Sequence, residues 1–146
     1  MMISQFQDED RTLQGFVDIC KMFFGNNLKA IVLFGSRASG EAKKYSDYDF
    51  LVVAENLPSD WRKRDNVVLE LDRHGISDIL LYTENEIEDA IHAVNPLIIN
   101  IFDRPNKILY GKTFIVKLYH LFLKDMARNI LKIGRNTWKI TGGINV

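Results

Sequence analysis

The sequence predicts an α/β layered domain, and three observations support that prediction. Short apolar runs typical of buried strands alternate with longer segments whose apolar residues recur at helical spacing. The chain has 146 residues, 47% of them hydrophobic, which is enough for one compact core and too little for two ordinary domains. No internal repeat or low-complexity segment interrupts the alternation. We therefore expect one domain with an appended helix.

The first predicted element is a helix that Asp8 or Asp10 caps and that Gly25-Asn26-Asn27 ends. Its apolar stripe consists of Leu13, Phe16, Val17, Cys20 and Phe24. Residues 28–34 follow as an apolar run, which predicts a buried strand.

The middle of the chain continues the alternation of strand and helix. A tight Gly35-Ser36 turn ends the first strand, and a short helical segment is expected to start near Ala38. The next predicted elements are a strand at 48–54, a helix capped by Ser59 or Asp60 and ending near Arg73, and a strand at 76–82.

The last third of the chain is mainly helical. Residues 83–86 form a capping-box pattern that opens a short acidic helix to about residue 94. Residues 97–102 are apolar and compatible with either helix or strand, and residues 108–110 predict a short edge strand. A long helix is expected from residue 113 to about residue 133.

Charge is distributed unevenly, although the formal net charge is zero. Residues 1–103 contain 10 Lys/Arg and 18 Asp/Glu, whereas residues 104–146 contain 9 and 1. Such a basic segment can contact nucleic acid, an acidic partner or the acidic body of a second copy in a homodimer, but it is more often the solvated side of an amphipathic helix. We therefore do not favour nucleic-acid contact. We expect residues 1–111 to form the domain, and residues 112–146 to form a basic amphipathic helix and tail packed on that domain or on a partner.

Cysteine usage and the N-terminal sequence both indicate a cytoplasmic protein. Cys20 is the only cysteine, so an internal disulfide is excluded and a reduced setting is expected. The first ten residues lack the basic and apolar segments of a signal peptide, and no apolar run approaches membrane-spanning length. We expect no membrane association.

A candidate site for phosphoryl transfer surrounds the start of the second predicted strand. Asp47 and Asp49 lie two residues apart, and side chains at that spacing share one face of a strand with Cα atoms about 6 to 7 Å apart. The upstream Gly35-Ser36 turn lets backbone N–H groups and a hydroxyl approach phosphates closely. Asp78 lies within an apolar run, where packing alone explains a carboxylate poorly. Carboxylate oxygens suit Mg²⁺ or Mn²⁺, and a pair of such ions neutralises the charge of a reacting phosphate ester.

Each of these residues also has a simpler interpretation. An isolated Asp-x-Asp is commonly a solvated turn followed by a charge at a strand edge, and only the Gly-Ser turn upstream favours metal binding. Asp78 can be an exposed strand residue or the ion-pair partner of Arg73. Arg37 can equally be a surface residue or a phosphate contact.

The stretch from Gly35 to Val53 resembles the signature of the DNA polymerase β-like nucleotidyltransferase superfamily, and the small size points to its minimal nucleotidyltransferases. The match extends loosely from about Leu28 to Gly111, with Asp78 at the place of the third family carboxylate. The resemblance implies a mixed, strongly twisted sheet flanked by helices. It also implies two Mg²⁺ ions, or Mn²⁺ in their place, and transfer of AMP from ATP, or of another NMP from its NTP, to a hydroxyl.

The resemblance also implies roles for individual residues. Gly35 and Ser36 would contact the β and γ phosphates, with Arg37 and Ser46 completing the nucleotide-binding set. The catalytic and metal-binding set would be Asp47 and Asp49, which bridge the metals, and Asp78, which helps to bind the metal that activates the acceptor and takes its proton.

Two departures from the family pattern stand out. Ser39 occupies the position before the glycine where many members carry Arg, so a phosphate-binding cation is missing or is supplied by Arg37 or Lys43. The basic helix from Thr113 onward exceeds the minimal domain. It would serve dimerisation, partner docking or RNA contact.

Many small members of the superfamily are antitoxins of HEPN/MNT toxin–antitoxin pairs. They silence an all-helical HEPN-type RNase toxin by attaching AMP to a tyrosine, and the resemblance implies this function first. Two alternatives stay open. The domain can be a catalytically idle module that neutralises the toxin by docking alone, or a stand-alone transferase acting on a small molecule such as an aminoglycoside, although no dedicated acceptor domain is evident.

Overall fold

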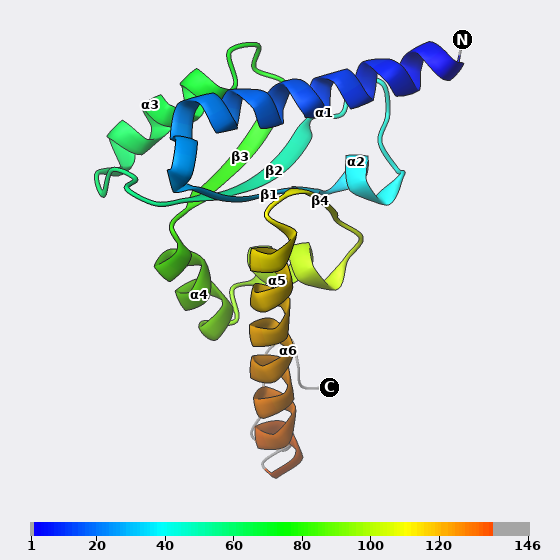
Figure 1. Cartoon of the computed structure of the whole chain (residues 1–146). Helices are drawn as coiled ribbons and strands as arrows, with labels where there is room; N and C mark the ends of the chain where they lie inside the picture. Colours follow the sequence, from blue (N-terminus) through cyan, green and yellow to red (C-terminus); the bar gives the residue numbers. More distant parts are fainter. Residues whose placement is uncertain (1, 136–146) are drawn as a thin grey trace.

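A mixed four-stranded sheet in the order β3-β2-β1-β4 lies at the centre of the fold (Figure 1). The computed structural model describes the backbone of residues 2–135 and the side chains of residues 9–129. The strands are β1 (Leu28–Phe34), β2 (Tyr48–Ala54), β3 (Ser77–Tyr82) and β4 (Lys107–Tyr110). β1 is antiparallel to both β2 and β4, whereas β2 and β3 are parallel. The predicted α/β fold with a mixed sheet, including the short edge strand, is confirmed.

Helices cover both faces of this sheet (Figure 1). They are α1 (Met2–Phe24), the 3-10 turn η1 (Gly25–Asn27), α2 (Ser36–Ser39), α3 (Trp61–Leu71), α4 (Glu84–His92), α5 (Pro96–Asp103) and α6 (Lys112–Arg135). α1 and α3 lie over one face, and α4, α5 and α6 lie over the other. The predicted tail beyond residue 135 falls outside the described residues. No described helix is both long and apolar enough to cross a membrane.

The period-two alternation of β2 divides the hydrophobic core between the two faces. Tyr48, Phe50 and Val52 belong to the cluster beneath α1 and α3, while Leu51 and Val53 belong to the cluster beneath α4 to α6. In the first cluster the ring of Phe50 stacks on that of Phe16, which lies on the apolar stripe predicted for α1, with centroids 3.9 Å apart. Burying large apolar side chains on both faces is what stabilises a sheet of this small size.

Capping signals decided some helix boundaries and not others. Asp60 accepts a hydrogen bond from the Arg62 amide (2.9 Å) and starts α3, as predicted. α1 begins at Met2, ahead of the predicted caps Asp8 and Asp10, because no glycine or proline before them stops the helix from extending.

The apolar stretch 97–102, ambiguous in sequence, is helical. Asn95 accepts a hydrogen bond from the Leu97 amide (2.9 Å), and Pro96 occupies the first helical position of α5. An N-cap residue followed by proline is a helix-start signal, since proline has no amide hydrogen to leave unpaired there. The sequence therefore contained the information that decides between helix and strand.

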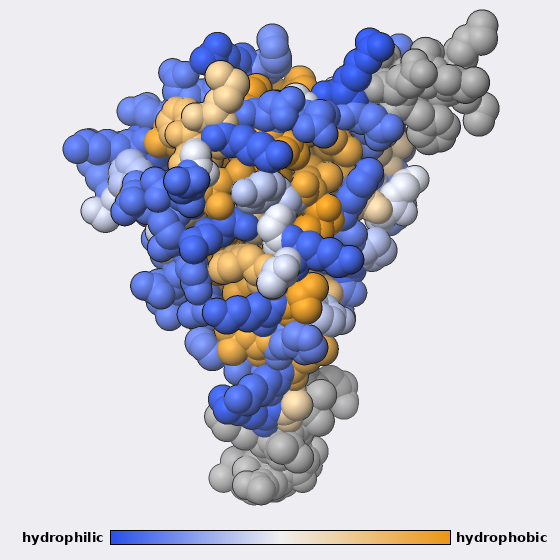
Figure 2. Space-filling view, viewed as in Figure 1, coloured by the Kyte–Doolittle hydropathy of each residue, from blue (hydrophilic) through white to orange (hydrophobic). Residues whose placement is uncertain are grey.

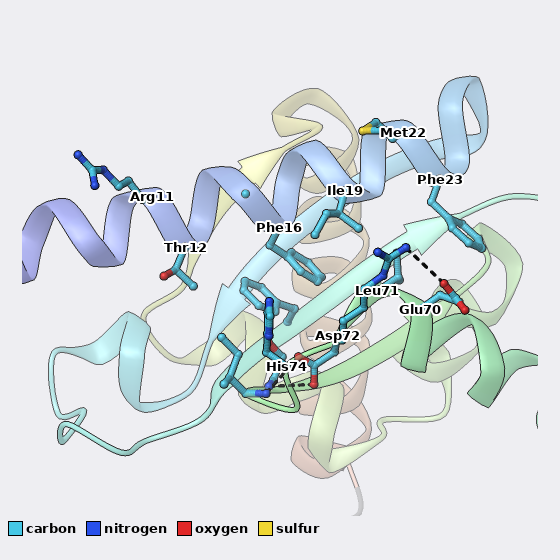
Figure 3. A pocket seen from close by; sticks show the side chains of 15 residues that line it. Arg11, Thr12, Phe16, Ile19, Met22, Phe23, Glu70, Leu71, Asp72 and His74 are labelled. Atoms are coloured by element: carbon cyan, nitrogen blue, oxygen red, sulfur yellow. Dashed lines mark hydrogen bonds and ion pairs between the residues drawn. The ribbon is translucent and has the colours of Figure 1, made fainter.

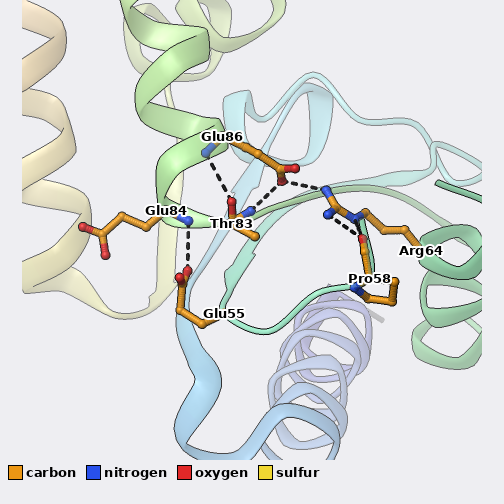
Figure 4. A network of polar contacts seen from close by, with 6 residues as sticks. All are labelled: Glu55, Pro58, Arg64, Thr83, Glu84 and Glu86. Carbon is orange, nitrogen blue, oxygen red and sulfur yellow. Dashed lines mark hydrogen bonds and ion pairs between the residues drawn. The ribbon is translucent and has the colours of Figure 1, made fainter. Parts of the chain in front are cut away.

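A polar network joins the loop after β2 to the start of α4 (Figure 4). The predicted capping box is present: Thr83 Oγ1 accepts from the Glu86 amide (3.2 Å), and Glu86 Oε1 accepts from the Thr83 amide (2.9 Å). Arg64 donates to Glu86 Oε1 (2.6 Å) and to the Pro58 carbonyl (2.7 and 3.0 Å). Burial raises the pKa of Glu86, but the Thr83 amide and Arg64 outweigh it, so that the pKa lies below its usual value.

α6 is anchored to the domain by its buried face. Ile115, Leu118 and Phe122 join the core beneath the sheet, and the buried Asp125 carboxylate contacts Nδ1 of His92 on α4 (2.5 Å). The opposite side of α6 carries exposed charged residues such as Lys124. Figure 2 shows that hydrophobic surface still appears between hydrophilic side chains along this face of the molecule. The helix predicted from residue 113 is thus built into the core over its first turns.

Candidate active site

The predicted catalytic carboxylates lie where β2 and β3 begin. Asp49 is the second residue of β2 and is half-buried. The parallel register pairs it with Asp78 of β3, which is exposed. Asp47 lies one residue ahead of β2 and is also exposed. The fold therefore brings all three residues to the same end of the sheet.

The charges of these carboxylates interact. The pKa of Asp49 lies above its usual value, chiefly because of burial and in addition because of the negative charges of Asp78 and Asp47. Among the described residues, however, no group of three or more His, Cys, Asp or Glu side chains is arranged to hold a metal ion. Metal binding by the three aspartates stays a prediction, and mutual repulsion is the physical reason why a cation would be favoured there.

Gly35 forms the wall of the site against Asp49. It follows β1 with φ +73° and ψ −157°, a backbone conformation that residues other than glycine rarely adopt. A Cβ atom at this position would lie 2.2 Å from Asp49 Oδ2. The backbone of Gly35 can therefore lie against the carboxylate only because the side chain is absent, which agrees with the close approach that the sequence predicts for this turn.

The short helix α2 begins at Ser36, two residues earlier than the sequence predicts. The Gly35 carbonyl accepts hydrogen bonds from the amides of Ala38 and Ser39 (3.1 Å each), so the glycine itself starts the helix. Ser39 turns its hydroxyl back to the Ser36 carbonyl (3.3 Å). Ser36 is thus the first residue of α2 and directly follows the glycine that approaches Asp49, and its nucleotide-binding role stays a prediction.

Arg37 and Ser46, also predicted to bind nucleotide, meet each other. The Arg37 guanidinium donates to the Ser46 carbonyl (2.8 and 3.2 Å) and to the Lys44 carbonyl (3.4 Å). The Ser46 hydroxyl accepts from the Lys43 amide (2.8 Å). Both side chains therefore bind the loop between α2 and β2, an arrangement that no spacing in the sequence indicates.

A hollow of about 680 Å³ opens on the other face of the sheet (Figure 3). It lies between α1 and residues 70–77, and none of the three carboxylates lines it. Its apolar wall includes Phe16 and Phe50 together with the partly exposed Ile19 and Phe23 of α1. The only signal in the sequence is that the apolar positions of α1 cover a wider arc than the sheet can bury. This hollow and the carboxylates are therefore separate features of the described residues.

Comparisons with known proteins identify the family of the chain and relate its fold to solved structures. Residues 13–113 match the sequence model of the nucleotidyltransferase domain. A Methanocaldococcus jannaschii protein that is provisionally named a protein adenylyltransferase is 37% identical over 136 residues, covering 88% of this chain and 91% of that protein. Two solved structures, a toxin–antitoxin complex with AMP-PNP and the MntA–HepT toxin–antitoxin complex, each have a TM-score of 0.52 with identities of 20% and 18%. Both alignments cover 86% of this chain, and they cover 92% of the first solved chain and 90% of the second. At these identities the likeness shows the fold alone.

Proposed function

The chain belongs to the nucleotidyltransferase domain family, and on that premise we propose that it transfers AMP from ATP to a tyrosine hydroxyl of a partner protein. Membership of the family confirms the prediction of a nucleotidyltransferase. The structural observation that supports nucleotidyl transfer is the close approach of the Gly35 backbone to Asp49, where an added Cβ would lie 2.2 Å from Asp49 Oδ2. Asp47 and Asp78 lie at the same end of the sheet, and their negative charges contribute to the raised pKa of Asp49. Such an arrangement would place a triphosphate, bound at the turn, beside acidic ligands.

In the proposed reaction the acceptor oxygen attacks the α-phosphorus of ATP. The bond between the α-phosphorus and the bridging oxygen breaks, pyrophosphate leaves, and the acceptor proton passes to Asp78. The Gly35–Ser36 backbone would hold the outer phosphates. Asp47, Asp49 and Asp78 would hold divalent cations, because carboxylate oxygens are the donors that Mg²⁺ and Mn²⁺ prefer. When bound, these cations neutralise charge on the triphosphate and on the departing pyrophosphate.

Two findings support a protein acceptor and an antitoxin role. The relative from Methanocaldococcus jannaschii is named for adenylyl transfer to protein, and it is matched over most of both chains. The two solved structures described above are toxin–antitoxin complexes, and one of them is named as a structure with AMP-PNP. We therefore propose a small helical HEPN-type toxin as the acceptor and ATP as the donor.

The test is to incubate the purified chain and its co-expressed partner with Mg²⁺ and with ATP labelled at either the α or the γ phosphate. Label from the α position should appear on a partner tyrosine, and label from the γ position should not. Asp47→Ala and Asp49→Ala should each abolish transfer. Asp65→Ala is the matched control, since it removes an exposed carboxylate from α3. Transfer of the γ label, or transfer that survives both site variants, would contradict the proposal.

A second candidate function is docking without catalysis. One observation favours it: Ser39 stands where many family members carry arginine, and the Arg37 guanidinium is hydrogen-bonded to the Ser46 carbonyl, so that neither residue offers a free cation for phosphates. In that case the Asp47→Ala/Asp49→Ala double variant would still protect cells from the partner. Loss of protection in the same variant would leave nucleotidyl transfer as the function.

A further inference from the structure

Arg37 contacts the residues on both sides of Asp47. Its Nε and Nη2 atoms donate to the Ser46 carbonyl, at 3.2 and 2.8 Å, and Nη2 also reaches the Lys44 carbonyl at 3.4 Å. Its guanidinium carbon lies 4.3 Å from the centroid of the Tyr48 ring. Ser46 and Tyr48 are the immediate neighbours of Asp47 in the chain. A single side chain therefore restrains the backbone before and after a predicted metal ligand.

The ring beneath Arg37 is itself fixed in the core. Tyr48 is buried and stacks on Phe50 with centroids 6.0 Å apart, and Phe50 stacks on Phe16 of α1 at 3.9 Å. The guanidinium is thus the outer layer of a stack that ends in a helix. Cation–π contacts and planar stacking favour arginine over lysine at such a place.

This stack lies on the face of the sheet opposite Asp49. Tyr48 and Asp49 are successive residues of β2, so their side chains point to opposite faces. The guanidinium lies over the Tyr48 ring, which belongs to the cluster beneath α1, and so on the opposite face of β2 from Asp49.

We propose that Arg37 is a positioning residue, which holds the α2–β2 loop so that Asp47 is placed beside Asp49, and is not a phosphate ligand. The catalytic consequence of this inference rests on the proposed function, whereas its structural part does not. A fork of N–H donors that binds one carbonyl through two nitrogens while its carbon lies over an aromatic ring cannot be reproduced by the ammonium of lysine.

The first measurement needs no activity. In Arg37→Gln and Arg37→Lys, hydrogen exchange of the Lys43 and Ser46 amides, which close the turn through the Ser46 hydroxyl (2.8 Å) and the Lys43 carbonyl (3.0 Å), should be about ten-fold faster than in the wild type. Lys44→Gln removes a charge from the same loop, and Tyr48→Phe keeps the ring, so both should exchange as the wild type does. Exchange that is unchanged in both Arg37 variants overturns the proposal.

The second measurement separates positioning from phosphate binding. In both Arg37 variants kcat for AMP transfer should fall about ten- to 100-fold, while KM for ATP should change by less than about three-fold. A KM that rises about ten-fold in Arg37→Gln and is restored in Arg37→Lys would show a phosphate ligand and overturn the proposal, because lysine can bind phosphate as a point charge. If the wild-type chain transfers nothing, the proposed function has failed, and the exchange measurement still decides the role of Arg37.

Discussion

The segments that follow β1 and β4 both begin with a glycine of positive φ, but the two glycines serve different purposes. Gly35 ends β1 with φ +73°, and Gly111 ends β4 with φ +77°. A Cβ at Gly35 would meet a carboxylate oxygen of Asp49 at 2.2 Å, whereas a Cβ at Gly111 would meet the Lys29 carbonyl oxygen at 2.0 Å and the Ala30 Cα at 2.9 Å. A side chain can move aside, but a strand in the middle of a sheet cannot. The first glycine therefore serves the site, and the second serves the attachment of α6.

The strongest test of this contrast is Gly111→Ala. Strain from positive φ and collision with the β1 backbone should together reduce the free energy of unfolding by about 2 to 5 kcal/mol, measured by urea denaturation. Gly15→Ala is the matched control: a Cβ there has open space and replaces glycine within a helix, so stability should rise by about 0.5 to 1 kcal/mol. If Gly111→Ala were as stable as the wild type, the two junctions would not differ as described.

Gly35→Ala should separate stability from activity. We expect a loss of about 1 to 3 kcal/mol from backbone strain, which is smaller than at Gly111 because the Asp49 carboxylate can rotate away. The same rotation removes the carboxylate from its place, so AMP transfer should fall by about 100-fold or more. The two measurements are denaturant unfolding and the α-label assay. Full activity in a stably folded Gly35→Ala would refute the role of this glycine in the site.

Asp49→Asn should stabilise the fold while abolishing AMP transfer. The pKa of Asp49 is raised, so the folded chain binds the proton of this carboxyl more tightly than the unfolded chain does. The resulting gain in folding stability is present below the unfolded-state pKa and is lost as pH rises through the folded-state pKa. At neutral pH the wild type therefore carries the full cost of the partly buried charge and of its repulsion by Asp78 and Asp47, which the neutral amide removes. Melting temperatures in EDTA should be higher for the variant at neutral pH and should converge in acid.

Millimolar Mg²⁺ or Mn²⁺ should raise the wild-type melting temperature and should change that of Asp49→Asn less, since a ligand stabilises only the state that binds it. Equal metal responses in the two proteins would count against the proposed metal site.

The smallest expected effect is at Glu86, far from the site. Its pKa is lowered in the folded chain, so its contribution to stability is present above the unfolded-state pKa and is lost as pH falls through the folded-state value. Glu86→Gln should reduce stability at neutral pH by about 1 kcal/mol or less, as for a partly exposed ion pair, and should match the wild type in acid. Asp89→Asn on the same helix is the control, and a pH-independent difference for Glu86→Gln would argue against the ionic contribution.

The parts of the site that the sequence predicts are those encoded by spacing. Asp47, Asp49 and the Gly-Ser turn lie close together in the chain, and Asp78 was identified by a carboxylate in an apolar run. The partners of Arg37 are not predictable in this way, because the Arg37 guanidinium binds backbone carbonyls, which every residue possesses. The hollow beside α1 was also not predictable, since it depends on how far α1 lies from residues 70–77. The start of α1 was not predictable because no glycine or proline marks that boundary.

The parallel pairing of β2 with β3 makes the site sensitive to insertions and deletions. Asp78 sits abreast of Asp49 only because the turn before β3 has its present length, which Asp72 fixes by accepting the amides of Ile76 and Ser77 (3.1 Å each). If one residue gained or lost in that turn slid β3 by a single step, Asp78 would pass to the far face, while the apolar residues after it could still be buried on either face. Under the proposed role of Asp78, a frame-preserving change of three nucleotides that caused such a slip would yield a folded chain without transfer activity.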